Sequence, residues 1–427
     1  MHNKKIKKVR ARQVLDSKGR PVVEVDVVTE SGHLGRAGAS TGSSVGKNES
    51  YVLRDNDPDN CGGLSVWEAV NNVNDTIAPE LIGMDVEDQA AIDKKMIELD
   101  GTRYKSNLGG NAIFATSAAV AYAAAAYNNK PLYQYLAKKP VEYMFSLAAN
   151  VVNGGAYGKD VLAFQEFMII PHSVDTVAES TRIIVEVFQR LERVIAKYNT
   201  YVHMGNYSGY GAPSDDPFKV MEMIFEAVQS LGYEKNVVYG LDCASSEFFN
   251  ADEGLYEYRG KLVDADEVIR ILSNLCNEFP IAFVEDALQE EDFEGYVRAN
   301  KEINSVVIGD DFLCTSLDRV KKAIEMDATR GMIFKPNQAG TMTEALDAAN
   351  YLIDRDMLVI PSGRAGGTLD SPDKEMGLAL GCYCVKAGAP RSGSRTASYN
   401  FAMRTEEELN IPMINVLDQP IFSHLKK

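Results

Sequence analysis

The sequence contains few histidines and cysteines, and neither residue type is arranged as a metal site. Its five histidines form no HxH or HExxH pattern, and its six cysteines form no CxxC pair. Zinc ribbons and thioredoxin-type redox motifs are therefore excluded. Scattered thiols without a pairing framework are typical of a reducing compartment, so we expect a cytoplasmic protein.

Basic charge and long apolar runs are also scarce. There are 44 Lys and Arg residues against 61 Asp and Glu, a formal net charge of −17. An acidic chain without a basic block suits neither a phosphate backbone nor an anionic membrane, so we expect no nucleic-acid or membrane partner. The N-terminal residues are basic but carry no apolar run of secretory length, which predicts no signal peptide. Residues 112–127 are Ala-rich and too short to span a bilayer, and we expect a buried helix there.

What is present is an ordinary globular composition in two regimes. The chain has 427 residues, of which 45% are hydrophobic and 25% are charged. Residues 5–29 alternate polar and apolar around the turn signal at 16–21, which predicts a β-hairpin. Residues 66–99 and 111–127 predict helices. Strands followed by helices indicate a small α+β domain, which we assign to residues 1–135.

Strands and helices alternate in the remainder of the chain, residues 136–427. The predicted strands are residues 236–242, 281–286, 305–311, 331–335, 357–361 and 380–386. The predicted helices include residues 217–231, 265–279, 316–326 and 341–354. Successive strand ends near 310, 335, 361 and 386 are about 25 residues apart, one strand plus one helix, and this even spacing favours a (β/α) barrel over an open sheet.

Charged residues stand at the ends of these predicted strands, where a barrel carries its active site. Three successive strands end in Asp242, Glu285 and Asp310, and the next ends in Lys335. Converging carboxylates require a cation, and oxygen-only ligation favours Mg²⁺. A lysine beside that cation has a lowered pKa, so Lys335 is a candidate general base, and we expect Lys386 to hold an anionic substrate. A single strand-end acid or lysine is more often a solvated cap; the complete set indicates a site.

The chain resembles enolase over essentially its whole length. The matching segments are LDSKGRP (15–21), GASTG (38–42), LRD (53–55), VNGG (152–155), QEFMI (165–169), DCASSEF (242–248), VED (284–286), GDD (309–311), KPNQAGT (335–341) and KAGAP (386–390). The resemblance implies an N-terminal α+β domain capping a modified (β/α)8 barrel, in a homodimer or higher homo-oligomer. It also implies the Mg²⁺-dependent dehydration of 2-phosphoglycerate to phosphoenolpyruvate through an enolate.

The resemblance implies a role for each of the strand-end residues. Asp242, Glu285 and Asp310 match the metal ligands. Lys335 matches the catalytic base that removes the proton α to the carboxylate. Lys386 matches the catalytic lysine that binds the substrate carboxylate near the metal. These roles agree with those that the strand spacing suggests.

Further site residues are implied by the resemblance alone. Glu166 matches the carboxylate of the catalytic acid network, with Gln165 beside it. Arg364 matches the phosphate-binding arginine. Ser40, in GASTG, and Tyr157, after VNGG, stand at substrate-binding positions.

The sequence departs from the family on the side that handles the leaving hydroxyl group and the phosphate. Tyr207 replaces the glutamate of the family's GDEGG loop, and we include it among the catalytic candidates as a proton donor. Tyr157 and Gly363 replace histidines, and Ala365 and Ala37 replace serines. Because removal of a general acid costs about 10²–10⁴-fold in rate, we expect a divergent member with poor ordinary enolase turnover.

Three functional hypotheses remain open at this point. The first is a Mg²⁺-dependent lyase that forms a metal-stabilised enolate from a phosphorylated or phosphonylated small 2-hydroxy carboxylic acid, with altered chemistry on the leaving-group side. The second is an ordinary but slow enolase. The third is a non-catalytic homologue that acts as a binding or structural protein.

Overall fold

The N-terminal part of the chain forms a small antiparallel sheet. The computed structural model describes residues 3–42, 46–158, 161–198, 202–206, 208–369 and 371–426. The strands β1 (Ile6–Leu15), β2 (Pro21–Thr29) and β3 (Leu34–Gly38) pair in that order. The predicted hairpin is therefore confirmed, and its turn is closed by the Asp16 carboxylate, which accepts the backbone N–H groups of Lys18 and Arg20.

Helices cover one face of this sheet. They are η1 (Cys61–Gly63), α1 (Trp67–Asn71), η2 (Asn72–Ile77), α2 (Ala78–Leu81), α3 (Gln89–Asp100), α4 (Gly110–Tyr127) and α5 (Leu132–Leu136). The helices predicted over 66–99 are confirmed as α1, η2, α2 and α3, and the chain turns between α2 and α3 at Gly83, where φ is 87°. The predicted helix over 111–127 is confirmed as the buried α4, which packs on β2 and β3.

Eight strands form a closed barrel in the C-terminal part. They are β4 (Ser146–Asn153), β5 (Glu166–Pro171), β7 (Val237–Asp242), β11 (Ile281–Glu285), β12 (Val306–Ile308), β13 (Gly331–Phe334), β14 (Leu358–Pro361) and β15 (Cys384–Lys386). Ladders and bridges join successive neighbours, and β15 pairs with β4 to close the ring. The fold is thus the predicted α+β domain plus β/α barrel.

The barrel is modified at its second strand. Strand β5 runs antiparallel to both of its neighbours, β4 and β7. The cause is local: β4 and β5 are joined through the short η3 (Gly155–Tyr157) and not through a crossover helix, and a direct connection returns the chain in the opposite direction. As a consequence, β5 begins at the edge of the barrel where the other strands end.

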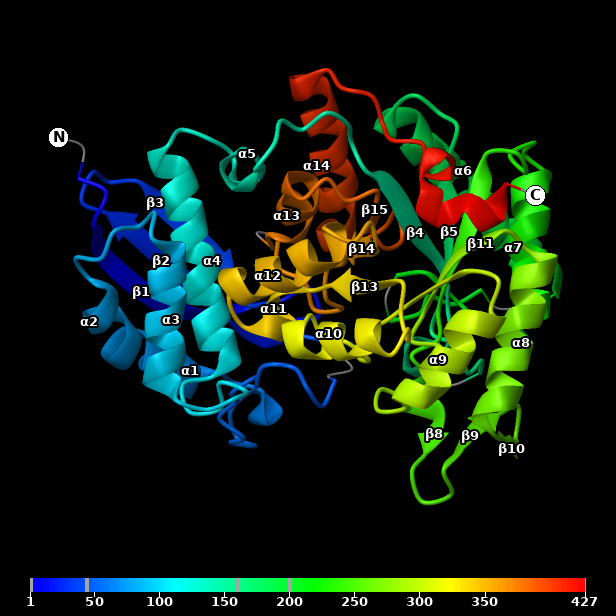
Figure 1. The fold of residues 1–427 in the computed structure, drawn as a ribbon, viewed down its shortest axis with the longest axis horizontal. Helices are drawn as coiled ribbons and strands as arrows, with labels where there is room; N and C mark the ends of the chain where they lie inside the picture. Colours follow the sequence, from blue (N-terminus) through cyan, green and yellow to red (C-terminus); the bar gives the residue numbers. More distant parts are fainter. Residues whose placement is uncertain are drawn as a thin grey trace.

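Helices surround the barrel (Figure 1). They are α6 (Val177–Tyr198), α7 (Pro217–Gln229), α8 (Ala265–Glu278), α9 (Phe293–Glu302), α10 (Leu317–Glu325), α11 (Pro336–Ala339), α12 (Met342–Ile353), α13 (Asp373–Ala379) and α14 (Gly393–Leu409). The remaining elements are β6 (Tyr210–Gly211), η4 (Ser245–Phe248), β8 (Phe249–Asn250), β9 (Leu255–Tyr258), β10 (Lys261–Val263), η5 (Val416–Asp418) and η6 (Pro420–Leu425). No helix among the described residues is long and apolar enough to cross a membrane.

Two predicted strands are too long. The strand predicted over 380–386 contains only β15, because Gly381 turns with φ 68° after α13. The strand predicted over 305–311 ends at Ile308. Asp310 and Asp311 therefore lie in the loop that follows β12, and the loop, not the strand, fixes their positions.

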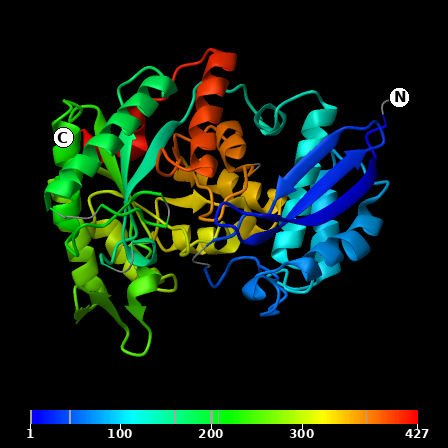
Figure 2. The ribbon, with the colours of Figure 1, turned by 180° about the vertical axis from the view of Figure 1, so that it is seen from behind.

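The two parts are packed closely against each other. The N-terminal sheet lies at one end of the molecule, with α7 and α8 at the other (Figures 1 and 2). Helices α3 and α4 contact α12 between them. The buried Asp93 carboxylate of α3 accepts the Ser117 hydroxyl of α4 at 2.6 Å and the Thr343 amide of α12 at 3.0 Å. The division near residue 135 itself stays a prediction.

The opposite end of the barrel is closed by apolar side chains. Phe422 of η6 packs into the barrel interior with residues of β5, β7, β11 and β14. The His424 ring also bonds to the carbonyl oxygen of Ile281, at the start of β11. Asp242 and Glu285 lie at the other end of the barrel, where β7 and β11 end.

Candidate active site

Strand direction brings the predicted charged residues to one edge of the barrel. Asp242 and Glu285 are the last residues of β7 and β11, and Lys386 is the last residue of β15. Glu166 is the first residue of the antiparallel β5, and it lies opposite Asp242 in the ladder. Lys335 directly follows β13.

Lys386 lies among three buried carboxylates. Its Nζ atom is 2.7 Å from Glu166 Oε2, 3.1 Å from Asp242 Oδ2 and 2.7 Å from Glu285 Oε2. Burial raises the pKa of Glu166 and of Glu285, and Lys386 opposes this in both. One ammonium group thus pairs with three carboxyl groups in this cluster.

This cluster fits a hard cation. The Oε1 atom of Glu285 is buried and has no hydrogen-bond partner among the described residues. The neighbouring donors are carboxylate oxygens, which are the ligands that Mg²⁺ prefers. Asp242, Glu285 and Asp310 do not bring three oxygen atoms within 4.8 Å of one another in this arrangement, in which Lys386 bonds the first two and Lys335 bonds the third.

A tighter acidic group lies beside the predicted ligands. Asp286, Asp310 and Asp311 each bring a carboxylate oxygen within 4.8 Å of the others. The Asp286 carboxylate already accepts the backbone N–H groups of Asp310 and Asp311, both at 2.8 Å. We therefore interpret Asp286 as the residue that holds the Asp310 loop in place. Strand spacing predicts no role for Asp286, although it follows Glu285 in the VED motif.

Lys335 and Gln338 converge on Asp310. The Lys335 ammonium is bonded to Asp310 Oδ2, and Gln338 Nε2 donates to Oδ1 at 2.8 Å. Burial lowers the pKa of Lys335, but Asp310 more than offsets this, and the net pKa is raised. In this arrangement Lys335 is held as an ammonium.

Arg364 is paired with a residue that sequence reasoning missed. Its guanidinium contacts both carboxylate oxygens of Glu49, at 2.6 and 3.1 Å, and both side chains are buried. Glu49 belongs to the N-terminal part of the chain and stands in no motif with Arg364. An anion that binds Arg364 must therefore compete with an internal carboxylate.

These residues enclose a cavity of about 20 Å³. It is lined by Gly42, Tyr157, Gln165, Glu166, Asp242, Asp310, Lys335, Ser362, Gly363, Arg364, Ala365 and Lys386. That volume holds about one water molecule, so a substrate requires side chains to move. Glu285 lies behind this lining, fully buried and bonded to Lys386.

Ser40, like Glu285, is not part of this lining. The Ser40 hydroxyl is 3.2 Å from the Thr368 hydroxyl and accepts the Thr368 N–H at 3.1 Å, so it does not face the cavity. Tyr207 lies outside the described residues. The roles of both stay predictions.

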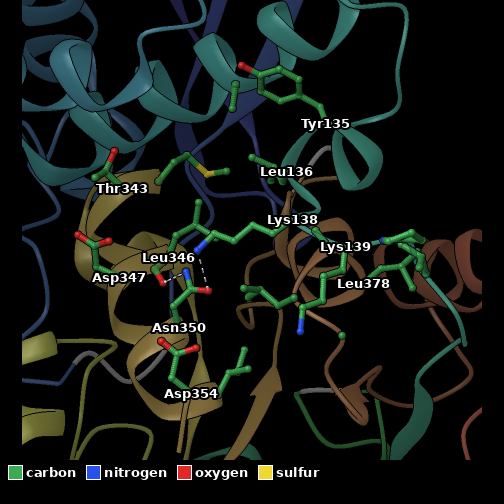
Figure 3. A pocket seen from close by; sticks show the side chains of 18 of the residues that line it. Tyr135, Leu136, Lys138, Lys139, Thr343, Leu346, Asp347, Asn350, Asp354 and Leu378 are labelled. Carbon is green, nitrogen blue, oxygen red and sulfur yellow. Dashed lines mark hydrogen bonds between the residues drawn. The ribbon is translucent and has the colours of Figure 1, made fainter.

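A larger cavity, of about 1000 Å³, lies elsewhere in the molecule. Figure 3 shows its lining, which comes from α12, α13 and the segment after α5, with Lys138 directed toward Asn350. It contains none of the carboxylates or lysines at the barrel mouth. Size alone therefore does not identify the site.

Family models match both parts of the chain. The model described as "Enolase, N-terminal domain" matches residues 6–136, and "Enolase, C-terminal TIM barrel domain" matches residues 142–414. The chain belongs to the enolase family. The Enolase of Methanococcus aeolicus is 41% identical over 407 residues, which are 95% of this chain and 95% of that protein. The Enolase of Methanosarcina barkeri is 40% identical over 409 residues, also 95% of both.

Membership of the enolase family identifies the protein as an enolase-superfamily lyase. Enolases depend in general on Mg²⁺, in agreement with the oxygen-rich cluster at the barrel mouth. Three of the departures from the family pattern lie at the cavity beside that cluster. Gly363 and Ala365 line the cavity with Tyr157, whereas Ala37 is fully buried in β3.

Proposed function

We propose that this lyase forms an enolate from a phosphorylated or phosphonylated small 2-hydroxy carboxylic acid, with altered chemistry on the leaving-group side. The observation that carries the proposal is the convergence of Lys335, Lys386 and the acidic cluster at one barrel mouth. Enolate formation needs a base that removes the α-proton of the substrate and a group that stabilises the negative charge that then develops on the same substrate.

Asp242, Glu285 and Asp310 would hold Mg²⁺. The buried, unpartnered Oε1 of Glu285 supports this assignment. When bound, the ion would supply positive charge beside the carboxylate on which negative charge develops. Lys386, released from part of its present ion-pair network, would hold the substrate carboxylate.

Lys335 would remove the proton α to the carboxylate. Its ammonium is now bonded to Asp310, so it becomes a base only when that carboxylate is engaged elsewhere and its pKa falls. Arg364 would bind the phosphoryl or phosphonyl group in exchange for Glu49. Gln165, bonded to Asp242, would contact the substrate, and Glu166, paired with Lys386, would belong to the catalytic acid network.

Ordinary conversion of 2-phosphoglycerate to phosphoenolpyruvate is the second candidate. Relatives named Enolase, such as that of Methanococcus maripaludis at 42% identity over 409 residues, favour it. The replaced histidines and serines around the leaving group favour the first candidate. Both candidates share the proton-abstraction step, and they differ in the elimination step.

Proton NMR of 2-phosphoglycerate with the protein and Mg²⁺ in D₂O tests the shared step. We expect the wild type to exchange the C2 proton, so that its signal is lost. We expect Lys335→Ala not to exchange it, so that the signal remains. The matched control is Lys94→Ala, which removes an exposed lysine and should exchange like the wild type.

The outcomes separate the hypotheses. Rapid phosphoenolpyruvate formation would establish the ordinary reaction. Identical behaviour of the wild type and Lys335→Ala on 2-phosphoglycerate and on a panel of phosphonylated 2-hydroxy acids would contradict enolate formation and leave the non-catalytic homologue.

We further propose a cytoplasmic homodimer. All six cysteines are free, which supports a reducing compartment. Sedimentation velocity at micromolar concentration tests the oligomeric state, and a single monomeric species would contradict the dimer.

A further inference from the structure

Tyr157 is held rigidly in the wall of the active-site cavity. It ends the η3 turn, where its N–H donates to the Gly154 carbonyl at 3.1 Å. Its own carbonyl accepts the N–H of Asn206 at 2.8 Å. The ring packs on Ala365, and the side chain is 8% exposed. The hydroxyl-bearing ring is thus fixed from two directions beside the site.

An ammonium group from the N-terminal domain stands over this ring. The Nζ atom of Lys18 is 5.6 Å from the Tyr157 ring centroid, within the range of a cation–π contact. Lys18 is positioned by the β1–β2 turn, in which Asp16 accepts its backbone N–H. Burial lowers the pKa of Lys18, Arg20 and Arg395 lower it further, and Asp16 opposes them.

A cation in this place favours release of the phenol proton. It stabilises the negatively charged phenolate more than the neutral phenol. Charged groups of both signs also line the cavity. Lys335, Arg364 and Lys386 favour the phenolate, as Lys18 does. Negative charge on Glu166, Asp242 or Asp310 opposes it. A proton donor is most effective when its pKa approaches the working pH.

We infer that Tyr157 is the catalytic residue that donates the proton to the leaving hydroxyl group, and that Lys18 is its positioning residue. The inference rests on the proposed function. After Lys335 has taken the α-proton, the C–O bond breaks, its electron pair leaves with oxygen, and the Tyr157 proton converts that oxygen to water. The phenolate under Lys18 then recovers a proton from solvent.

Separating exchange from elimination tests this assignment. With 2-phosphoglycerate and Mg²⁺ in D₂O, Tyr157→Phe should exchange the C2 proton at the wild-type rate but form product about 10²–10⁴-fold more slowly. Tyr198→Phe, at an exposed tyrosine outside the site, is the matched control and should retain product formation, and Tyr207→Phe tests the other candidate donor. The inference is overturned if Tyr207→Phe, and not Tyr157→Phe, loses product, or if the wild type exchanges the proton and forms no product.

Lys18 is tested by its effect on acidity. Lys18→Met should slow product formation by about 2- to 30-fold, the range of a cation–π contact, and should move the alkaline limb of the pH profile to higher pH. Lys18→Arg should restore both. A purely structural role would change the rate without moving that limb.

A readout independent of turnover completes the test. In protein labelled with 3-fluorotyrosine, the ¹⁹F signal that disappears in Tyr157→Phe reports the ionisation of Tyr157. We expect its midpoint to rise in Lys18→Met. A midpoint that does not move overturns the inference. A wild type that does not exchange the C2 proton contradicts the proposed function instead, and the titration still decides the role of Lys18.

Discussion

Lys386 shows how a single residue compensates the charge of the site. It bonds three carboxylates that are almost completely removed from solvent. Removal of one partner from a buried ion-pair network leaves uncompensated charge, which costs about 3–5 kcal/mol. We predict that Lys386→Met lowers the free energy of unfolding by about that amount in EDTA, as measured by urea denaturation.

Mg²⁺ should recover part of this loss, because a bound cation takes over the compensation. Lys94→Met, which removes an exposed lysine, should change stability by less than about 0.5 kcal/mol. Equal stability of Lys386→Met and the wild type in EDTA would show that the three carboxylates are protonated and need no cation.

Glu49 should set the affinity of Arg364 for anions. Charge-assisted hydrogen bonds contribute about 1.5–3 kcal/mol, so a neutral amide in place of the Glu49 carboxylate should release the guanidinium for an incoming anion. We predict that Glu49→Gln binds inorganic phosphate at least about tenfold more tightly by calorimetry. Weaker binding would mean that Glu49 orients Arg364 instead of competing for it.

Residues of the site differ in how far the sequence predicts them. Asp242, Glu285 and Lys335 follow apolar strands, so strand direction alone brings them together. Glu49 carries no such signal, because the contact that matters joins it to Arg364, far along the chain, and depends on how a loop crosses the barrel mouth. Gln338 is similar, since its bond to Asp310 depends on side-chain direction.

At the scale of elements, β5 explains why the barrel is only partly predictable. Its reversal is a result of the direct β4–β5 connection, and this reversal places Glu166 opposite Asp242. The even spacing of the later strands does not predict the reversal of β5. Glu166 is therefore predicted through the resemblance to a family, not through the strand pattern.

Strand β3 should tolerate no side chain at Gly35. A Cβ atom there would lie 2.1 Å from the Ala119 carbonyl oxygen and 2.2 Å from the Ala123 amide nitrogen, both backbone atoms of α4. We predict that Gly35→Ala costs about 1–3 kcal/mol of stability by overpacking. Gly393→Ala meets nothing within 4 Å and should be neutral or stabilising. Equal urea midpoints for the two variants would contradict this packing.

Asp26 joins all three strands of the N-terminal sheet through Arg12 of β1 and Arg36 of β3. Burial raises the pKa of Asp26, but Arg36 and Arg12 outweigh it and lower the pKa from 3.8 to about 2. A lowered folded-state pKa contributes stability above pH 3.8 that is lost as the pH falls through 2. We predict that Asp26→Asn loses about 1–2 kcal/mol at pH 7 and shows a flatter acid dependence between these pH values in thermal unfolding. An unchanged acid dependence would show that solvent screens the interaction of Asp26 with the two arginines.

At the scale of the whole molecule, the site belongs to both parts of the chain. Glu49, Gly42 and Lys18 come from the N-terminal domain, and the carboxylates and lysines come from the barrel. The sequence predicts two domains from their different alternation patterns. It does not predict that both domains contribute residues to the site, because contacts between domains leave no periodic signal.

Metal binding should therefore stabilise the entire chain, and it should reveal which acidic group holds the ion. A ligand present at 100 times its Kd stabilises the folded state by about 2.7 kcal/mol. We predict that millimolar Mg²⁺ raises the thermal midpoint of the wild type, that Asp242→Asn abolishes the shift, and that Asp311→Asn keeps it. Both substitutions replace one buried aspartate by asparagine, so they are matched in chemistry. If Asp311→Asn abolishes the shift and Asp242→Asn keeps it, the ion lies among Asp286, Asp310 and Asp311, and the carboxylates around Lys386 are then a charge cluster without a metal.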